Sequence, residues 1–482
     1  MNKKTKPPPI MKTRTPHTII GRSLTLAAVV ALWLLPAQMQ AQQEATNLAK
    51  ELAAEKEDTS TEKKDTLTEK KADGAENIVT ADINIMTRGE LRKGGLSGED
   101  NGEDFAAFVL ERMRLGLTYE RGPLSLRFAA QQGNTWGSKE DNELSVYEAW
   151  VKFCSRGGLF ATLGRQELSY DDQRIFGADD WSMTAKTHDA LRFGYEGKVH
   201  KAHAILSFNQ NPENMDNGTH FSGGLQPHKA LQALWYHYDL PRTGLGVSLL
   251  FMNVGMQASE RSHQDRTFQQ QLFGGHACYE SQPFAAHASL YFQRGKQEDG
   301  LKLESWMMSL KAMARPSAHW EAYAGYDYLS GDDNYSVPAT GVFGLILHKK
   351  VKGFTSIYGS HHRFYGAMDF FYVSTYFSGF SPGLQNLYVG TKWKPTQRLR
   401  FDLAYHYLAT ATGMKHARRS LGHEVEFSAT WEPMRDVSLS AGYTFMDGTK
   451  TMELLKRTDK HRQLHWGWIM LSVSPRLFQI KW

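Results

Sequence analysis

From Asn77 onward, apolar and polar residues alternate in short segments that turn residues separate. In residues 399–407, the odd-numbered positions are apolar or aromatic, whereas Arg400, Asp402 and His406 are polar. Because successive side chains of a β-strand point to opposite faces, this period predicts strands with one apolar and one polar face. The same alternation recurs in residues 124–131, 284–293, 320–328, 424–432 and 436–446.

The connections between these segments alternate between tight turns and long polar loops, a rhythm typical of membrane barrels with periplasmic turns and extracellular loops. A soluble sandwich would share the two-residue period but not this rhythm. The tight turns fall near 121–123, 155–158, 196–199, 240–243, 281–283, 315–317, 395–397 and 433–435. The long loops fall near 93–104, 134–142, 169–187, 211–228, 257–266, 412–421 and 449–463.

A plain count gives nineteen segments, but a barrel whose chain starts and ends in the periplasm needs an even number of strands. If His362–Ser378 were a strand, the tight turn at 395–397 would lie outside the cell. Treating 331–383 as one long extracellular or lumen-folded loop restores the rhythm. We therefore predict an all-β fold, a transmembrane antiparallel β-barrel of about eighteen strands, over residues 77–482.

The final segment supports this prediction. Before Ser474-Pro475 the apolar residues are Ile469, Leu471 and Val473, and after it the apolar positions shift to even numbers and end at Trp482. A bulge at the proline would cause such a shift. A C-terminal aromatic residue on an apolar strand is typical of outer-membrane barrels.

Hydropathy excludes a polytopic helical membrane protein. The mean hydropathy is −0.49, and after the N-terminal segment no stretch approaches eighteen consecutive apolar residues. A barrel accommodates these values, because half of each strand can be polar.

The first 41 residues are predicted to be a signal peptide, because Lys12, Arg14 and Arg22 precede an apolar run at 24–35 that is too short to span a membrane. We expect cleavage after Ala41, and Met11 is an alternative start. Residues 42–76 lack aromatic residues and are rich in Glu, Lys, Asp and Thr, which predicts a flexible charged linker.

Charge gives no reason to expect nucleic-acid binding. The chain has 56 Lys and Arg against 51 Asp and Glu, and the predicted signal peptide holds six of the basic residues and no acidic ones, which leaves 50 against 51. Cys154 and Cys278 lie in predicted strands without a CxxC partner, so a metal or redox site is not expected and their pairing stays open. No cofactor is predicted.

The densest cluster of charged residues is GRQELSYDDQRIFGADDWSMTAKTHDALRFGYE, beginning at Gly164. This string resembles the signature of the alginate-export family of outer-membrane barrels. Weaker matches follow in the family's order: YDYLSGDD at 326–333, YGSHHRFYGAMDFF at 358–371 and LGHEVEF at 421–427. The second of these suggests a Bacteroidetes-like member. The resemblance covers most of 105–482.

The resemblance implies an eighteen-stranded outer-membrane barrel whose constriction, lined by arginine and acidic residues, selects an anionic polysaccharide for passive transport or export. Arginine suits carboxylates, and neighbouring acids would prevent a polymer from being trapped. The expected partners are outer-membrane lipid and an anionic saccharide or other small solute, and the protein is expected to be a monomer.

Along each predicted strand, odd and even positions face opposite sides of the wall, which we call side-chain parity. This parity and the resemblance together give a set of candidate pore-lining residues. Arg165 fits parity poorly, since it falls on the side of Leu159 and Leu163. Each candidate could equally be a wall charge paired with a neighbour. The set is Arg112, Arg114, Arg127, Glu148, Lys152, Arg165, Glu167, Arg174, Asp189, Arg192, Asp327, Lys392, Lys394, Arg400, Asp402 and His406.

Other functions remain as alternatives. Several acids, among them Glu424 and Glu426 on one segment, leave room for a general solute porin with another selectivity. No GxSxG, HExxH, P-loop or GxGxxG motif is found in a suitable context, so an enzyme is not expected. The residues 360–362 (Ser-His-His) supply the residue types of a barrel lipase, but a loop hydrogen-bond cluster is the favoured interpretation. The acidic run at 330–334 departs from calcium-loop spacing and favours a turn.

Overall fold

The computed structural model describes residues 75–94, 105–139, 144–209, 226–258, 266–332, 350–371, 381–414, 417–456 and 463–482. The predicted signal peptide (1–41) and all but the last two residues of the predicted linker (42–76) lie outside this set. The predicted loop at 331–383 is described in part.

The described residues form strands almost throughout, with one 3₁₀ helix, η1 (His361–Arg363), and one short α-helix, α2 (Lys450–Lys456). The first ten strands are β1 (Asn77–Lys93), β2 (Ala106–Arg121), β3 (Leu124–Thr135), β4 (Leu144–Cys154), β5 (Leu159–Gln166), β6 (His188–Glu196), β7 (His200–Phe208), β8 (Ala230–Leu240), β9 (Leu245–Gln257) and β10 (Thr267–Ser281). The others are β11 (Phe284–Lys296), β12 (Lys302–Ser317), β13 (Trp320–Leu329), β14 (Lys350–Val351), β15 (Leu384–Thr396), β16 (Leu399–Ala409), β17 (Ser420–Met434), β18 (Val437–Gly448), β19 (Gln463–Val473) and β20 (Arg476–Lys481).

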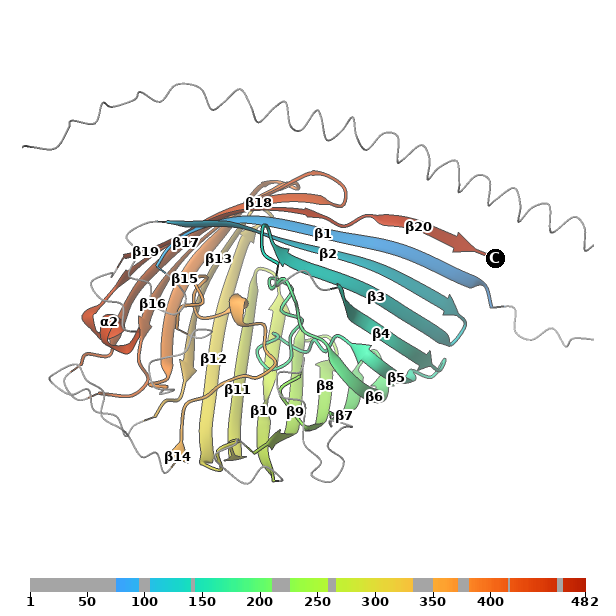
Figure 1. Cartoon of the computed structure of the whole chain (residues 1–482), viewed down its shortest axis with the longest axis horizontal. Coiled ribbons are helices and arrows are strands. Elements are labelled where there is room, and N and C mark those ends of the chain that lie inside the picture. Colours follow the sequence, from blue (N-terminus) through green and yellow to red (C-terminus); the bar gives the residue numbers. More distant parts are fainter. Residues whose placement is uncertain are drawn as a thin grey trace, which may run out of the picture. The chain divides into compact units, whose positions relative to one another are not determined.

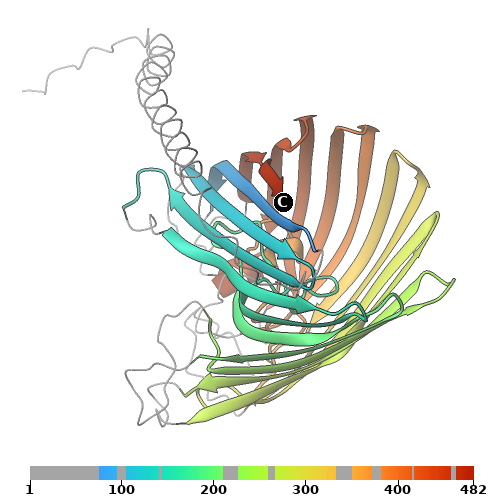
Figure 2. The ribbon, with the colours of Figure 1, turned by 90° about the vertical axis from the view of Figure 1, so that its right-hand side faces the viewer.

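Eighteen of these strands close into one antiparallel barrel (Figures 1 and 2). Each strand pairs with the next along the chain, β13 pairs with β15, and β19 returns to β1. The two-residue β14 lies parallel to β12, and β20 continues β19 along β1, so neither adds a barrel strand. The predicted barrel and its strand number are confirmed.

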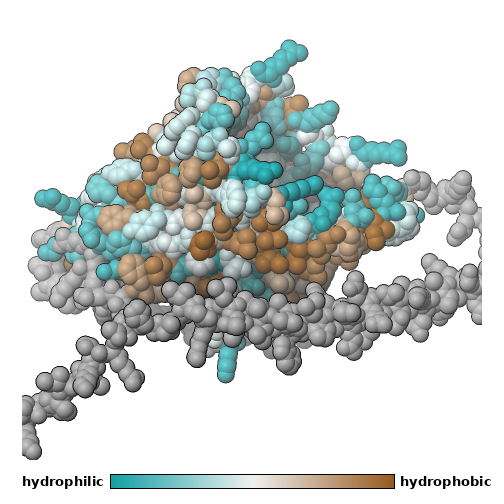
Figure 3. All heavy atoms as spheres, turned by 90° about the horizontal axis from the view of Figure 1, so that it is seen from above, coloured by the Kyte–Doolittle hydropathy of each residue, from teal (hydrophilic) through white to brown (hydrophobic). Residues whose placement is uncertain are grey.

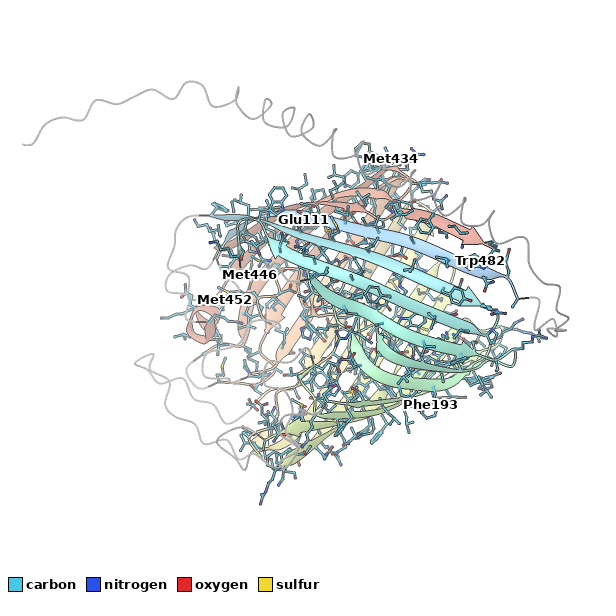
Figure 4. The ribbon with its side chains drawn as sticks, turned by 45° about the vertical axis from the view of Figure 1, so that its right-hand side comes forward. Glu111, Phe193, Met434, Met446, Met452 and Trp482 are labelled. Atoms are coloured by element: carbon cyan, nitrogen blue, oxygen red, sulfur yellow. The ribbon has the colours of Figure 1, made fainter. Side chains whose placement is uncertain are left out.

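The end of the chain closes the barrel as predicted. Pairing with β1 shifts register between Ala81 and Asp82, opposite the stretch that follows Pro475. Beyond this bulge, the backbone N–H and C=O groups of Trp482 bond to those of Asn77 at 3.1 and 3.0 Å. Trp482 therefore lies beside the start of β1 (Figure 4).

The two faces of the wall differ as the alternation predicts. On β16, the side chains of Leu403 and Tyr405 are exposed on the outer face, whereas His406 is buried on the inner face. On β17, Val425 and Phe427 are exposed outside and Glu424 is buried inside. Figure 3 shows hydrophobic residues spread over the outer surface in this view. Apolar side chains thus face the lipid region and polar ones face the lumen.

Short turns join the strands at one end of the barrel and longer connections join them at the other. The short turns agree with the predicted ones within a few residues, and the segment 297–301 is one further connection at the long-loop end. Neither α2 nor η1, the helices of the described part, has the length and apolar character needed to cross a membrane. Cys154 and Cys278 are both free thiols on separate strands.

Candidate functional site

Two connections fold into the lumen and narrow it. One is the β5–β6 loop (167–187), and the other is the segment 350–371 between β13 and β15. Each carries apolar residues that are buried, such as Leu168 and Phe176 in the first and Phe354 and Tyr358 in the second. Burial of this apolar surface favours packing inside the barrel over exposure to water.

The two loops contact each other directly. Phe176 and Tyr358 form a parallel β-bridge, and their rings stack at 5.5 Å with an interplanar angle of 7°. The backbone N–H of Gly177 donates to the carbonyl oxygen of Tyr358 at 2.9 Å, and that of Ser360 donates to Gln173 at 2.9 Å. The loops therefore form one constriction rather than two independent segments.

Two adjacent carboxylates fasten the first loop to the wall. Asp171, at a positive φ of 51°, accepts hydrogen bonds from Trp235 Nε1 and Ser248 Oγ. Asp172 accepts from Ser289 Oγ at 2.9 Å. Burial raises the pKa of the Asp171 carboxyl above its ordinary value. These bonds tie the loop to β8, β9 and β11.

Arg174 links the first loop to a further strand of the wall, β13. Its Nη2 lies 2.8 Å from Asp327 Oδ1 on β13, and its Nε lies 3.1 Å from Asp172 Oδ2. Its guanidinium also lies 3.9 Å from the ring centre of Phe364 in the second loop. Burial alone would lower the pKa of Arg174, but the neighbouring Asp327 and Asp172 carboxylates raise it. Arg174 is therefore a fixed cation at the centre of the constriction.

The second loop is fastened to β17. The backbone N–H of Met368 donates to Glu424 Oε1 at 3.1 Å, and that of Ala367 donates to Glu426 Oε1 at 2.6 Å. The preceding residue is Gly366, at a φ of +97°, where a Cβ atom would lie 2.8 Å from a Glu424 carboxylate oxygen. Glycine is therefore required for this close approach.

A cavity of about 250 Å³ lies beside the constriction; we refer to it as the charged cavity. It brings together five of the predicted pore-lining residues, namely Arg174, Asp327, Lys392, Asp402 and His406. Its other lining residues include Lys311, Tyr323, Phe364, Arg363, Tyr388 and Glu426.

Most charges of this cavity are paired. Asp327 bonds to Arg174, Asp402 lies 3.8 Å from Lys392 Nζ and accepts from the Tyr323 hydroxyl, and His406 Nε2 lies 3.3 Å from Glu426. Lys311 and Arg363 have no carboxylate partner within salt-bridge distance among the described residues.

Sequence reasoning missed these two cations. Lys311 lies on the inner face of β12, on the same side as the buried Ser305 and Ser309, so strand parity carried the signal. Arg363 lies in the YGSHHRFYGAMDFF string, but only the inward fold of that loop brings it to the cavity.

A second group of predicted residues lies on strands β2 to β4. Arg112 and Arg114 face Asp180 of the first loop at 3.3 and 3.6 Å. Arg127 lies between Asp82 at 2.6 Å and Glu148 at 3.1 Å. These predicted residues share the inner face, and each is paired.

The remaining candidates lie apart from these two groups. Glu167 accepts a hydrogen bond from Tyr147, and burial raises its pKa. The guanidinium of Arg192 and the ammonium of Lys152 approach the ring of Phe160, which faces inward. Lys394 and Arg400 lie on the inner face near the short-turn end of β15 and β16.

Arg165 and Asp189 are not brought into the lumen with the other candidates. They form a two-bond pair at 2.8 Å on the side of the wall that carries the exposed Leu163 and Phe193. Arg165 also donates to the carbonyl oxygen of Val146 at 3.1 Å, on a part of β4 that no longer pairs with β5. The pair therefore covers an open strand edge on the outer face.

The alternative sites are engaged in loop structure. The Ser360 hydroxyl donates to Gln173 and accepts from the Asp179 backbone N–H, while His362 bonds to Asp369 at 2.8 Å and stacks on Trp181. The Asp332 carboxylate accepts backbone N–H groups from residues 352, 353 and 381, as a loop-fastening group does. Among the described residues, no cluster of His, Cys, Asp and Glu suits a metal ion.

Comparisons with known proteins agree with this architecture. The alginate-export family profile matches residues 107–420. A comparison with curated proteins gives no match.

Solved structures share the barrel fold at low sequence identity. Pseudomonas aeruginosa OpdL has a TM-score of 0.57 and 10% identity, with 83% of this chain and 99% of that chain covered. Pseudomonas aeruginosa OccK3 (OpdO) has a TM-score of 0.55 and 12% identity, with 83% and 96% covered. Acinetobacter baumannii OccAB1 has a TM-score of 0.55 and 9% identity, with 83% and 97% covered. The protein is a barrel channel of the outer membrane. Because the family profile covers more than half of the chain, the protein belongs to the alginate-export family.

Proposed function

We propose that the protein is a passive channel for anionic saccharides or related anionic solutes, working as a single chain, and that it is a Bacteroidetes-like member of the family. The predicted residues on the inner face of the wall form the solute path, with the charged cavity as its recognition site. Arg165 and Asp189 are left out of this path because of their position on the outer face.

The observation that supports this proposal most strongly is the state of the cations in the charged cavity. Arg174 and Lys392 are already bound to carboxylates, whereas Lys311 and Arg363 have no such partner among the described residues. A solute carboxylate could therefore bind these two side chains without displacing an internal ion pair. A guanidinium suits a carboxylate particularly well because it offers parallel donors.

The other lining groups suit a sugar rather than a simple anion. Tyr323, Tyr388 and Phe364 provide flat apolar surfaces, and small-molecule sites typically combine such surfaces with a few polar groups. The carboxylates of Asp402 and Glu426 lie in the same cavity and weaken the hold on an anion. A channel needs this balance, because a solute that binds too tightly does not leave.

Single-channel recording in planar bilayers tests the proposal. We expect oligouronates to interrupt the current through the wild-type channel, and Lys311→Gln or Arg363→Gln to shorten each interruption about tenfold or more, as for one lost charged hydrogen bond. Lys302→Gln is the matched control, since Lys302 lies on the same strand but outside the cavity and binds Glu304. Unchanged interruptions in both cavity variants would contradict the proposed site.

A general porin with different selectivity is the second candidate, and the three carboxylates of the charged cavity favour it. In that case simple ions would pass and no saccharide, charged or neutral, would interrupt the current. The same recordings, with sulfated glycans and simple anions as further solutes, separate the two functions.

A further inference from the structure

A second cavity, of about 280 Å³, lies between both loops and strands β3, β4 and β6; we refer to it as the neutral cavity. Its wall residues include Ser145 near the start of β4 and His188 at the start of β6, both next to the long connections. The charged cavity instead has its wall residues on β12, β13 and β15 to β17. The two cavities therefore lie against different parts of the barrel wall.

The chemistry of the neutral cavity differs from that of the charged one. Among its described lining residues, Lys186 carries a charge. Its Nζ is already paired, at 3.1 Å from an Asp179 carboxylate oxygen and 2.6 Å from the Gly359 carbonyl oxygen. The other lining groups are hydroxyl, amide, imidazole and apolar groups. The cavity therefore offers no unpaired charge to an ionic ligand.

His188 provides the observation that points to a ligand. Its side chain is only 2% exposed, and its Nδ1 has no hydrogen-bond partner in the described part of the chain. Aromatic neighbours hold the ring, with Tyr358 edge-on at 5.0 Å and Phe176 at 5.8 Å. Buried polar atoms are nearly always hydrogen-bonded, so this unpaired nitrogen, on a residue that lines the cavity, indicates a missing partner.

The surrounding groups fit a hydroxyl-rich ligand. Gln226 is buried, and its Oε1 accepts a hydrogen bond from Asn209 Nδ2 at 3.1 Å. This bond does not use the amide nitrogen of Gln226. Tyr147 and Tyr358 contribute aromatic rings to the wall. A sugar hydroxyl can both donate and accept, so it can pair with an imidazole nitrogen and an amide together. The volume is close to the lower end of small-molecule sites, which is roughly 300 Å³.

We propose that the neutral cavity is a second saccharide subsite that binds one uncharged sugar ring, with His188 Nδ1 and the Gln226 amide bonding to its hydroxyl groups. The inference rests on the proposed saccharide channel and extends it, because it names a subsite for the uncharged part of the solute. The channel then has separate positions for a carboxylate-bearing unit and for a neutral unit.

Current interruption by a neutral gluco-oligosaccharide, added on the long-loop side of the wild-type channel, tests this subsite. We expect interruptions in the wild type, and interruptions about fivefold to tenfold shorter in His188→Phe, which keeps a ring but removes the nitrogen. Gln226→Leu is the second variant, in case His188→Phe does not fold. Lys302→Gln, outside both cavities, should match the wild type.

Absence of interruption in the wild type, or unchanged interruptions in both variants, would overturn the subsite. Oligouronate in the same recordings reports on the charged cavity separately. If oligouronate interrupts the current and the neutral saccharide does not, the proposed function stands and the subsite fails. If only the neutral saccharide does so, the subsite stands and anionic selectivity fails.

Discussion

The buried ion pair between Arg174 and Asp327 holds the first loop in the lumen, and replacing Asp327 tests this role most sharply. Asp327 is 1% exposed and accepts from Arg174, Ser309 and Asn386 at 2.8, 2.7 and 3.0 Å. In Asp327→Asn the amide keeps the shape of the carboxylate but not its charge, so Arg174 is left with Asp172 alone.

Breaking one partner of a buried ion pair typically costs about 3–5 kcal/mol. At ~3 kcal/mol, the ratio of docked to undocked loop falls about 150-fold. We therefore expect Asp327→Asn to show a larger and noisier single-channel conductance than the wild type, while heat-dependent gel migration shows an intact barrel.

Asp402→Asn is the matched control, because Asp402 is partly exposed and lies 3.8 Å from Lys392, so its pair contributes at most about 1 kcal/mol. The double variant Arg174→Met with Asp327→Asn should recover part of the wild-type conductance, since it removes the unpaired buried charge. If Asp327→Asn behaves like Asp402→Asn, the ion pair does not hold the loop.

Three further predictions concern the second loop, α2 and the lipid face. Gly366→Ala should destabilise the docked second loop by roughly 1–2 kcal/mol, because alanine is strained at this φ and its Cβ would contact Glu424. Faster proteolysis of this loop would reveal the loss of stability. Burial lowers the pKa of Lys456 on α2 to about 7, so above that pH the unfolded segment binds more protons than the folded one. The free energy of opening α2, near Met452 (Figure 4), should therefore increase by up to about 2.5 kcal/mol from pH 7 to pH 9, as measured by hydrogen exchange. Lys456→Met should remove this pH dependence. Leu403→Arg on the outer face should destabilise the barrel by about 2–4 kcal/mol in urea unfolding from vesicles, and an effect near zero would place this position outside the hydrocarbon layer.

The barrel itself could be predicted from the sequence, because lipid and lumen impose opposite requirements on alternate residues. The alternation at 399–407 gave the correct faces for Arg400, Asp402 and His406. The rhythm of connections predicted the number of strands, because the count had to be even and the extra segment at 362–378 therefore belonged to a loop.

The inward fold of the loops could not be predicted in the same way. The sequence allows loop 331–383 to be extracellular or lumen-folded, because a polar loop and a loop that fills the lumen share much of their composition. Only the contacts of its described part, such as Phe176 with Tyr358 and Met368 with Glu424, place it in the lumen.

Local irregularities limited the prediction of individual site residues. Tyr147 is skipped in the pairing of β3 with β4, and this bulge brings its side chain to the inner face together with Glu148. Arg165 had the parity of the outer face, and the structure keeps it there beside Asp189. At this position the alternation along β5 predicts the observed face, and the resemblance does not.

The most direct test of the central claim is the efflux of oligouronates from proteoliposomes, compared with that of neutral oligosaccharides of the same length. At low solute concentration, we expect faster efflux of the oligouronate through the wild-type channel. We also expect the double variant Lys311→Gln with Arg363→Gln to remove the difference. Equal rates in the wild type, or a difference that survives in the double variant, would contradict recognition of anionic saccharides by the charged cavity.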